Sequence, residues 1–227
     1  PDLEKWALHR LWALDRHVRQ CCDNFDFHDM YVQLYHFCTN DLSAFYFDIR
    51  KDSFYCDPAD SAERRAARTV LDQVFRCLTT WLAPFLCFTA EEVWLTRFPE
   101  DESVHLQMFP TIPADWQNDA LVEKWERVRR LRRVVTGALE IERREKRIGS
   151  SLQSAPTVYA DEDTMAACVD VDLAQLCITS ALTLVGTEPP HDAYSLEDVP
   201  GISVVPVMAD GGKCQRCWKV LPEVAVE

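Results

Sequence analysis

Apolar residues recur every three or four positions through most of the first 150 residues, and this spacing predicts amphipathic α-helices. We expect one helix over residues 3–22 and a second that begins at an N-cap on Asp26 and ends near Ile49. A capping box at Asp60 predicts the start of a third helix. Because such helices bury their apolar faces against one another, the chain should fold as a mainly α protein.

The helical pattern continues beyond a proline break. Pro84 interrupts the third helix, and a capping-box signature at Thr89 predicts that a new helix starts there. Residues 99–115 are rich in proline and are typical of an irregular crossing. The longest pattern covers residues 118–148, with its first residue as N-cap and Gly149 as the stop signal.

The sequence changes character after residue 150. Short β-prone runs occur at residues 157–159, 178, 182–185 and 202–205, with a helix predicted at 161–168. The sequence therefore predicts three parts. They are a helical domain (1–150), a small α/β subdomain (151–210) and the first half of a zinc-binding module (211–227).

Composition fits a folded protein of the cytoplasm. The chain is 48% apolar, with seven Trp and eleven Phe, which is enough to build a core. No run reaches the roughly 18 apolar residues that a membrane-spanning helix needs. Several of the ten cysteines fall in apolar-periodic segments, where a free Cys packs as a small hydrophobe, so we expect reduced thiols.

Residues 124–147 contain ten Lys and Arg residues but only four Glu residues, although the net charge of the chain is −13. A positive stripe on an acidic body can steer a polyanion to one face, and eight of the ten residues are Arg, which favours RNA. The alternative is a solvated helix face balanced by Glu140, Glu142 and Glu145. On the RNA interpretation, the residues that would position the nucleic-acid backbone are Arg129, Arg132, Arg133, Arg143 and Arg147.

Cys214 and Cys217 form a CxxC motif near the end of the chain, and two thiolates on one tight turn are half of a tetrahedral zinc site. No second pair follows, so we expect a truncated module that binds zinc poorly. A redox motif is the alternative, but Gln215 and Arg216 replace the Pro or Gly expected between such cysteines. Trp218 beside Arg216 is either a stacking platform for an unpaired base or a lid over the metal.

The sequence contains no visible reaction centre. We find no nucleophile–base pair, no carboxylate dyad and, with six Gly in all, no glycine-rich phosphate loop. The six His residues are scattered, and His28 and His36 share a helix face without flanking carboxylates, which is more typical of structural residues than of ligands. We therefore predict no catalytic residue in this chain.

Several segments resemble the C-terminal region of bacterial isoleucyl-tRNA synthetases, which are class I aminoacyl-tRNA synthetases. Together they extend over nearly the whole chain, and the last of them is the most discriminating. They are Glu4–Leu8 (similar to DRWAL), Tyr46–Asp52 (FYLDxxKD, with Phe47 for Leu), Ala83–Trp94 (APILxFTAEEVW), Ser103–Pro110 (SVHLxxFP), Val128–Leu152 (VR…ALExxRxxKxIGxSLxA) and Lys213–Trp218 (KCxRCW).

The resemblance implies that residues 1–150 are a class I synthetase anticodon-binding helical bundle, and that the α/β part and zinc knuckle help to hold the anticodon loop. Arg216 and Trp218 would then approach a base, and zinc would bind Cys214 and Cys217. The implied partner is tRNA(Ile). The implied full-length enzyme is a cytoplasmic monomer that activates isoleucine with ATP and Mg, charges tRNA(Ile) and edits mischarged valine.

The HIGH and KMSKS elements that carry this chemistry do not occur in the sequence, so the fragment should be inactive alone. Three alternatives stay open. The chain could be the anticodon-binding domain of a valyl-tRNA synthetase, a non-catalytic RNA-binding module or a structural zinc domain.

Overall fold

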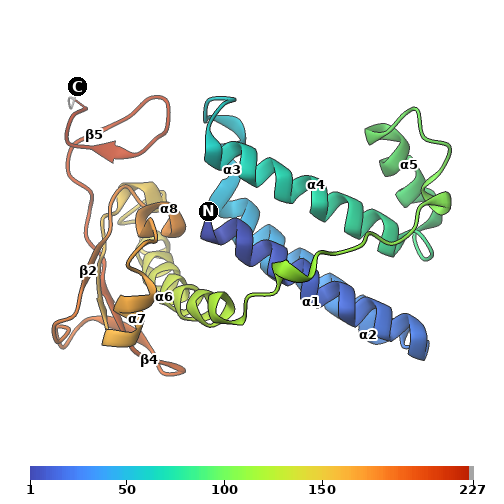
Figure 1. The fold of residues 1–227 in the computed structure, drawn as a ribbon. Helices are drawn as coiled ribbons and strands as arrows, with labels where there is room; N and C mark the ends of the chain where they lie inside the picture. The colour runs from blue at the N-terminus through green and yellow to red at the C-terminus, as the bar shows by residue number, and fades with distance from the viewer. Residues whose placement is uncertain (225–227) are drawn as a thin grey trace. The chain divides into compact units, whose positions relative to one another are not determined.

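The computed structural model describes residues 1–224, which fold into two compact units, Pro1–Val122 and Glu123–Glu227 (Figure 1). The last three residues of the module predicted at 211–227 lie outside the described part. Most of the described chain is helical, and the prediction of a mainly α fold is confirmed. Among the helices of residues 1–224, none has both the length and the apolarity that crossing a bilayer requires.

The first unit is built from helices joined by short turns. They are α1 (Asp2–Asn24), α2 (Phe27–His36), the π-helix η1 (Phe37–Phe47), α3 (Asp48–Tyr55), α4 (Ala62–Leu82), α5 (Cys87–Arg97) and the short 3₁₀ segments η2 (Val104–Leu106) and η3 (Ala114–Trp116). The segments α2, η1 and α3 follow one another without a break. The predicted second helix is therefore present and continues past Ile49 to Tyr55.

The core of this unit lies where the periodicity predicts it. Helix α1 packs against α2 and α4, and Trp6, Leu11 and Val18 on its inner face are buried. Burying each such side chain contributes about 1.5–3 kcal/mol, which outweighs intrinsic helix propensity. The apolar stripe is thus what selects this packing.

A buried ion pair joins the two ends of the first helical hairpin. The Arg50 guanidinium on α3 donates to Glu4 of α1 from Nε at 2.7 Å and from Nη2 at 3.0 Å. Arg50 also pairs with Glu63 at the start of α4. Because an unpaired charge here would cost several kcal/mol, this contact fixes which turn of α1 faces α3.

Two predicted helix caps are confirmed. The Asp26 carboxylate accepts the Asp29 N–H at 3.2 Å at the start of α2, and the Asn118 side chain accepts the Leu121 N–H at 3.0 Å. Each satisfies one backbone donor that the first turn of a helix leaves without a partner.

Two other caps differ from the prediction. Helix α4 is capped by the Ser61 hydroxyl, which accepts the Arg64 N–H, and not by Asp60. Helix α5 begins at Cys87, so Thr89 lies inside it and caps nothing. In both cases the predicted cap lies two residues from the first residue of the helix. The pattern of side chains does not determine the start of a helix more closely than this.

The second unit contains most of the long helix α6 (Asp119–Arg144) and a small mixed sheet (Figure 1). Strand order in the sheet is β2-β1-β4-β3, with β1 and β2 parallel and the other neighbours antiparallel. The elements after α6 are η4 (Ser151–Gln153), β1 (Thr157–Ala160), α7 (Glu162–Ala167), α8 (Leu173–Cys177), β2 (Thr183–Val185), β3 (Tyr194–Leu196), β4 (Val199–Val205), β5 (Gly212–Lys213) and β6 (Val220–Leu221). Helices α7 and α8 form the crossover that a parallel β1–β2 pair requires.

Two predictions for this unit need correction. Helix α6 ends at Arg144, because Lys146 takes the left-handed conformation at φ 61° and the Arg147 N–H bonds back to the Glu142 carbonyl. This is a Schellman ending with Lys where Gly149 was the expected stop. Ile178, predicted in a strand, is the left-handed C-cap of α8. The compact units divide at residue 122, so most of the long helix belongs to the same unit as the sheet that follows it.

Candidate nucleic-acid interface

Helix α6 presents its arginines around a buried apolar stripe. Trp125, Val128, Leu131, Val135 and Leu139 are all buried within the protein. With this stripe buried, some basic residues of α6 contact neighbouring elements and others face solvent. The ten basic residues of the run are therefore not equivalent.

Two exposed arginines form ion pairs with acidic residues far along the chain. Arg127 Nη1 lies 3.3 Å from Asp163 at the start of α7, and Arg133 Nη2 lies 2.6 Å from Asp198 just before β4. The Arg133 guanidinium lowers the pKa of the Asp198 carboxyl. Arg133, one of the predicted RNA contacts, is thus engaged within the unit.

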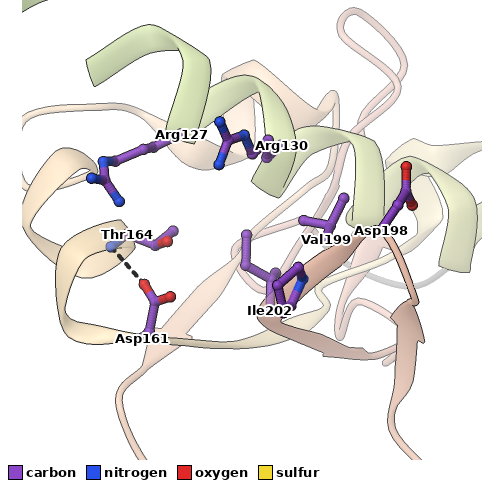
Figure 2. Close-up of a pocket in the computed structure, with 8 residues that line it drawn as sticks. Arg127, Arg130, Asp161, Thr164, Asp198, Val199 and Ile202 are labelled. Atoms are coloured by element: carbon purple, nitrogen blue, oxygen red, sulfur yellow. Dashed lines mark hydrogen bonds between the residues drawn. The ribbon is translucent and has the colours of Figure 1, made fainter. Parts of the chain in front are cut away.

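A pocket lies beneath α6 between these pairs (Figure 2). Arg127 and Arg130 reach over it from α6, while Asp161 and Thr164 of α7 and Ile202 of β4 form its floor. Arg130 is exposed, and no hydrogen bond or ion pair joins it to any other described residue. Its guanidinium is therefore available to an external anion.

Arg129 and Arg132 are half-buried and hold the helix in place. Arg132 Nε donates to the Leu176 carbonyl of α8 at 2.8 Å, and both arginines make further interactions within the protein. The Leu176 carbonyl belongs to the last turn of a short helix, where a cation is favourable. The predicted role of Arg129 and Arg132 as RNA contacts has to be weighed against this structural role.

At the C-terminal end of α6, two arginines pair with nearby glutamates, as expected for a solvated helix face with balanced charges. Arg143 pairs with Glu140 at 2.5 Å and donates to the Ser151 hydroxyl at 2.9 Å. Arg147 clasps Glu142 through two hydrogen bonds of 2.6 Å, which lower the pKa of that carboxyl.

Two neighbouring cations at this end of α6 have no such partner. Arg144 and Lys146 are exposed, and in the described chain neither forms an ion pair.

The CxxC segment forms a compact knuckle between β5 and β6. Across its base, the Cys214 N–H donates to the Lys219 carbonyl at 2.8 Å and the Trp218 N–H donates to the Cys214 carbonyl at 2.9 Å. Trp218 takes a left-handed φ of 64° and is 62% exposed, with Lys213 Nζ 5.5 Å from the centre of its ring. An exposed indole beside a cation favours the stacking-platform interpretation over a buried lid.

Cys214 and Cys217 give the knuckle two side chains that can bind a metal. Backbone N–H groups of Cys217 and Arg216 point to the Cys214 sulfur and lower the pKa of its thiol, which favours the thiolate that zinc binds. Within residues 1–224, no third metal-binding side chain joins these two cysteines. The described chain therefore supplies two of the four ligands that a structural zinc takes.

One serine joins the knuckle to the exit of α6. The Ser180 hydroxyl accepts the Val220 N–H at 2.7 Å and donates to the carbonyl of Leu152, the residue after Ser151, which Arg143 contacts. These bonds link the segment that follows α6 to the base of the knuckle within the second unit.

Sequence reasoning identified the basic run and the knuckle but missed Arg130, Arg144 and Ser180 as distinctive members. The acidic partners Asp163 and Asp198 lie 36 and 65 residues from the arginines that they neutralise. A pattern of neighbouring residues carries no signal for such pairs.

Comparison with known proteins agrees with this geometry. The model of the anticodon-binding domain of tRNA ligases matches residues 4–159. The chain is 55% identical over 225 residues to an isoleucine–tRNA ligase of Agrobacterium fabrum, 55% over 226 residues to one of Ruegeria pomeroyi and 50% over 225 residues to one of Bartonella henselae. In each case 99% of this chain aligns, but it spans only 23% of the relative's length. By the extent of the domain match, this chain belongs to the family of tRNA-ligase anticodon-binding domains.

Proposed function

We propose that this chain is the part of an isoleucine–tRNA ligase that binds the anticodon region of tRNA(Ile). The observation that carries the proposal is 55% identity to isoleucine–tRNA ligases over 99% of the chain. The parent enzyme would use ATP and Mg to activate isoleucine, charge tRNA(Ile) and remove mischarged valine. The chain carries no HIGH or KMSKS element for these reactions.

The binding surface we infer lies at the end of the second unit where α6 meets the knuckle. Arg144, Lys146 and Arg216 would neutralise phosphates, with Arg130 as a further contact along α6, and Trp218 would stack on a splayed base. Arg129, Arg132, Arg133, Arg143 and Arg147 would act mainly by holding this surface in shape. The contacts that these arginines make within the protein support this division of roles.

Zinc would add rigidity to the knuckle and take no part in the chemistry of charging. Cys214 and Cys217 would hold it, together with ligands from outside residues 1–224. We further propose a cytoplasmic monomer and a functional boundary near residue 150, where the helical pattern of the sequence ends and the β-prone runs begin.

A valyl enzyme is the second candidate within this class, and the names of the relatives compared above do not favour it. A non-catalytic RNA module and a structural zinc domain differ in their behaviour toward tRNA. The RNA module would bind tRNAs without preference for tRNA(Ile), and the zinc domain would bind no tRNA.

The test is a binding titration of the full chain with tRNA(Ile) at about 0.1 M salt, with tRNA(Val) as competitor. The triple variant Arg130→Ala/Arg144→Ala/Arg216→Ala should weaken binding by roughly one to two orders of magnitude, because it removes three phosphate contacts. Equal affinity for both tRNAs would overturn the isoleucine assignment. Unchanged affinity of the variant for tRNA(Ile) would overturn the proposed binding surface.

A matched control is Lys5→Ala on α1, which removes an exposed positive charge 3.9 Å from Asp2 in the first unit. We expect this variant to bind tRNA(Ile) as the unaltered chain does. A loss equal to one third of the triple variant's effect would mean that net charge, and not the proposed surface, determines affinity.

A further inference from the structure

Three side chains of metal-binding type converge in the first unit, far along the sequence from the CxxC knuckle. His17 and Cys21 lie near the C-terminal end of α1, and Asp29 lies in the first turn of α2. One ligand atom from each lies within 4.8 Å of the other two, and within residues 1–224 this is the one group of three or more such residues.

The backbone explains why they meet. His17 and Cys21 are four residues apart and so occupy one face of α1. The helix then ends in a Schellman turn with Phe25 at φ 57°, where the Asp26 N–H bonds to the Cys21 carbonyl at 2.9 Å. This sharp reversal brings the first turn of α2, with Asp29, back over Cys21.

The contact between His17 and Asp29 has an unusual geometry. Asp29 Oδ2 lies 2.7 Å from His17 Nε2, yet this buried nitrogen makes no hydrogen bond. At so short a distance the failure must be angular, so the oxygen lies off the axis of the ring N–H. A nitrogen and an oxygen that bind one common ion lie in this off-axis relation, because the ion, and not the oxygen, occupies the axis.

The spacing is close to that of a tetrahedral site. Cys21 Sγ lies 3.9 Å from Asp29 Oδ2, and the bond lengths of zinc predict a sulfur–oxygen edge of about 3.6 Å. The nitrogen–oxygen edge would have to open to about 3.4 Å. Asp29 can make this adjustment, because its side chain is 41% exposed and its other oxygen makes only a long bond of 3.4 Å to Gln33.

We propose that His17, Cys21 and Asp29 form a binding site for a zinc-like divalent cation that joins the end of α1 to the start of α2. An imidazole, a thiolate and a carboxylate match the ligand preferences of zinc, and a water would complete the four. Binding displaces the proton of the Cys21 thiol to solvent. Burial, and after it the charge of Asp29, raise the pKa of this thiol.

The experiment uses the full chain with Cys214→Ser/Cys217→Ser, so that the knuckle does not compete, and Co²⁺ as a spectroscopic probe. We expect one ion per chain, a thiolate-to-cobalt charge-transfer band and the intense visible bands of tetrahedral cobalt. Asp29→Asn should weaken binding at least about tenfold while leaving the fold intact, because this side chain is partly exposed. Zn²⁺ should displace the cobalt and raise the melting temperature.

The matched control is Cys22→Ser, which alters the adjacent cysteine but none of the three ligands. It should keep the charge-transfer band that Cys21→Ser abolishes. The absence of a thiolate band in the double-serine chain would overturn the proposal. A band that survives Cys21→Ser, or one lost equally in Cys22→Ser, would also overturn it.

Discussion

Asp161 stabilises the start of α7 both as a hydrogen-bond acceptor and as a negative charge. Its Oδ1 accepts the Thr164 N–H at 2.8 Å, and hydrogen bonds from the Thr164 hydroxyl and N–H lower the pKa of the carboxyl. The charge also faces the positive end of the helix dipole. The sequence predicts a helix at residues 161–168, and the structure confirms a helix there, with Asp161 as its N-cap.

We expect Asp161→Ala to lower the free energy of unfolding by about 1 kcal/mol at neutral pH. Because the folded-state pKa lies below the unfolded value near 3.8, the carboxylate contributes fully above that value. Its contribution disappears as the pH falls through the folded-state pKa. Urea unfolding of both proteins between neutral pH and pH 2 measures this.

Asp161→Asn is the control for the charge, since an amide oxygen can still cap the helix. It should keep most of the stability at neutral pH and lose the acid-dependent part. If Asp161→Ala and the unaltered chain lose stability in parallel as the pH falls, the role assigned to the carboxylate is wrong.

For helices and strands, the sequence predicts a feature when the residues that cause it are close to it in the chain. The buried stripes of α1 and α6 follow from spacing alone, and side chains one turn away determine the caps at Asp26 and Asn118. Helix ends set by backbone conformation were missed, as with the left-handed Lys146. Strands β3, β5 and β6, each two or three residues long, are too short to carry a period.

Gly211 is the element-scale feature most sensitive to substitution. It has φ +115° just before β5, and a Cβ atom there would lie 2.1 Å from the Leu221 carbonyl oxygen of β6. Neither backbone segment can yield without breaking the pairing of Gly212 with Leu221. We expect Gly211→Ala to expose the amides of the knuckle to rapid hydrogen exchange while those of β4 stay protected.

Gly149→Ala is the matched control, because its Cβ atom would meet nothing closer than Gln153 Oε1 at 3.5 Å. Exchange across the knuckle should be unchanged in that variant. Equal protection of the β5–β6 amides in Gly211→Ala would mean that the ribbon tolerates a side chain at this position, contrary to the geometry.

For the whole molecule, the candidate site shows where charge counting fails. A tally of residues 124–147 finds ten cations, but the fold neutralises Arg127, Arg133, Arg143 and Arg147 with acidic partners. The run therefore predicts the place of the interface and overestimates its strength. Which cations remain available depends on pairings between remote segments, and only the folded structure contains them.

This difference can be measured through the salt dependence of tRNA binding. Each phosphate contact with a single strand contributes about −0.7 to the slope of log affinity against log salt. If the exposed Arg130, Arg144, Lys146 and Arg216 make the contacts, the slope should be about −3, whereas ten contacts would give about −7. Affinities for the tRNA(Ile) anticodon stem-loop over a series of salt concentrations give this slope. A slope near −7 would mean that the internal ion pairs break when tRNA binds, so that their arginines contact the RNA instead of the acidic side chains.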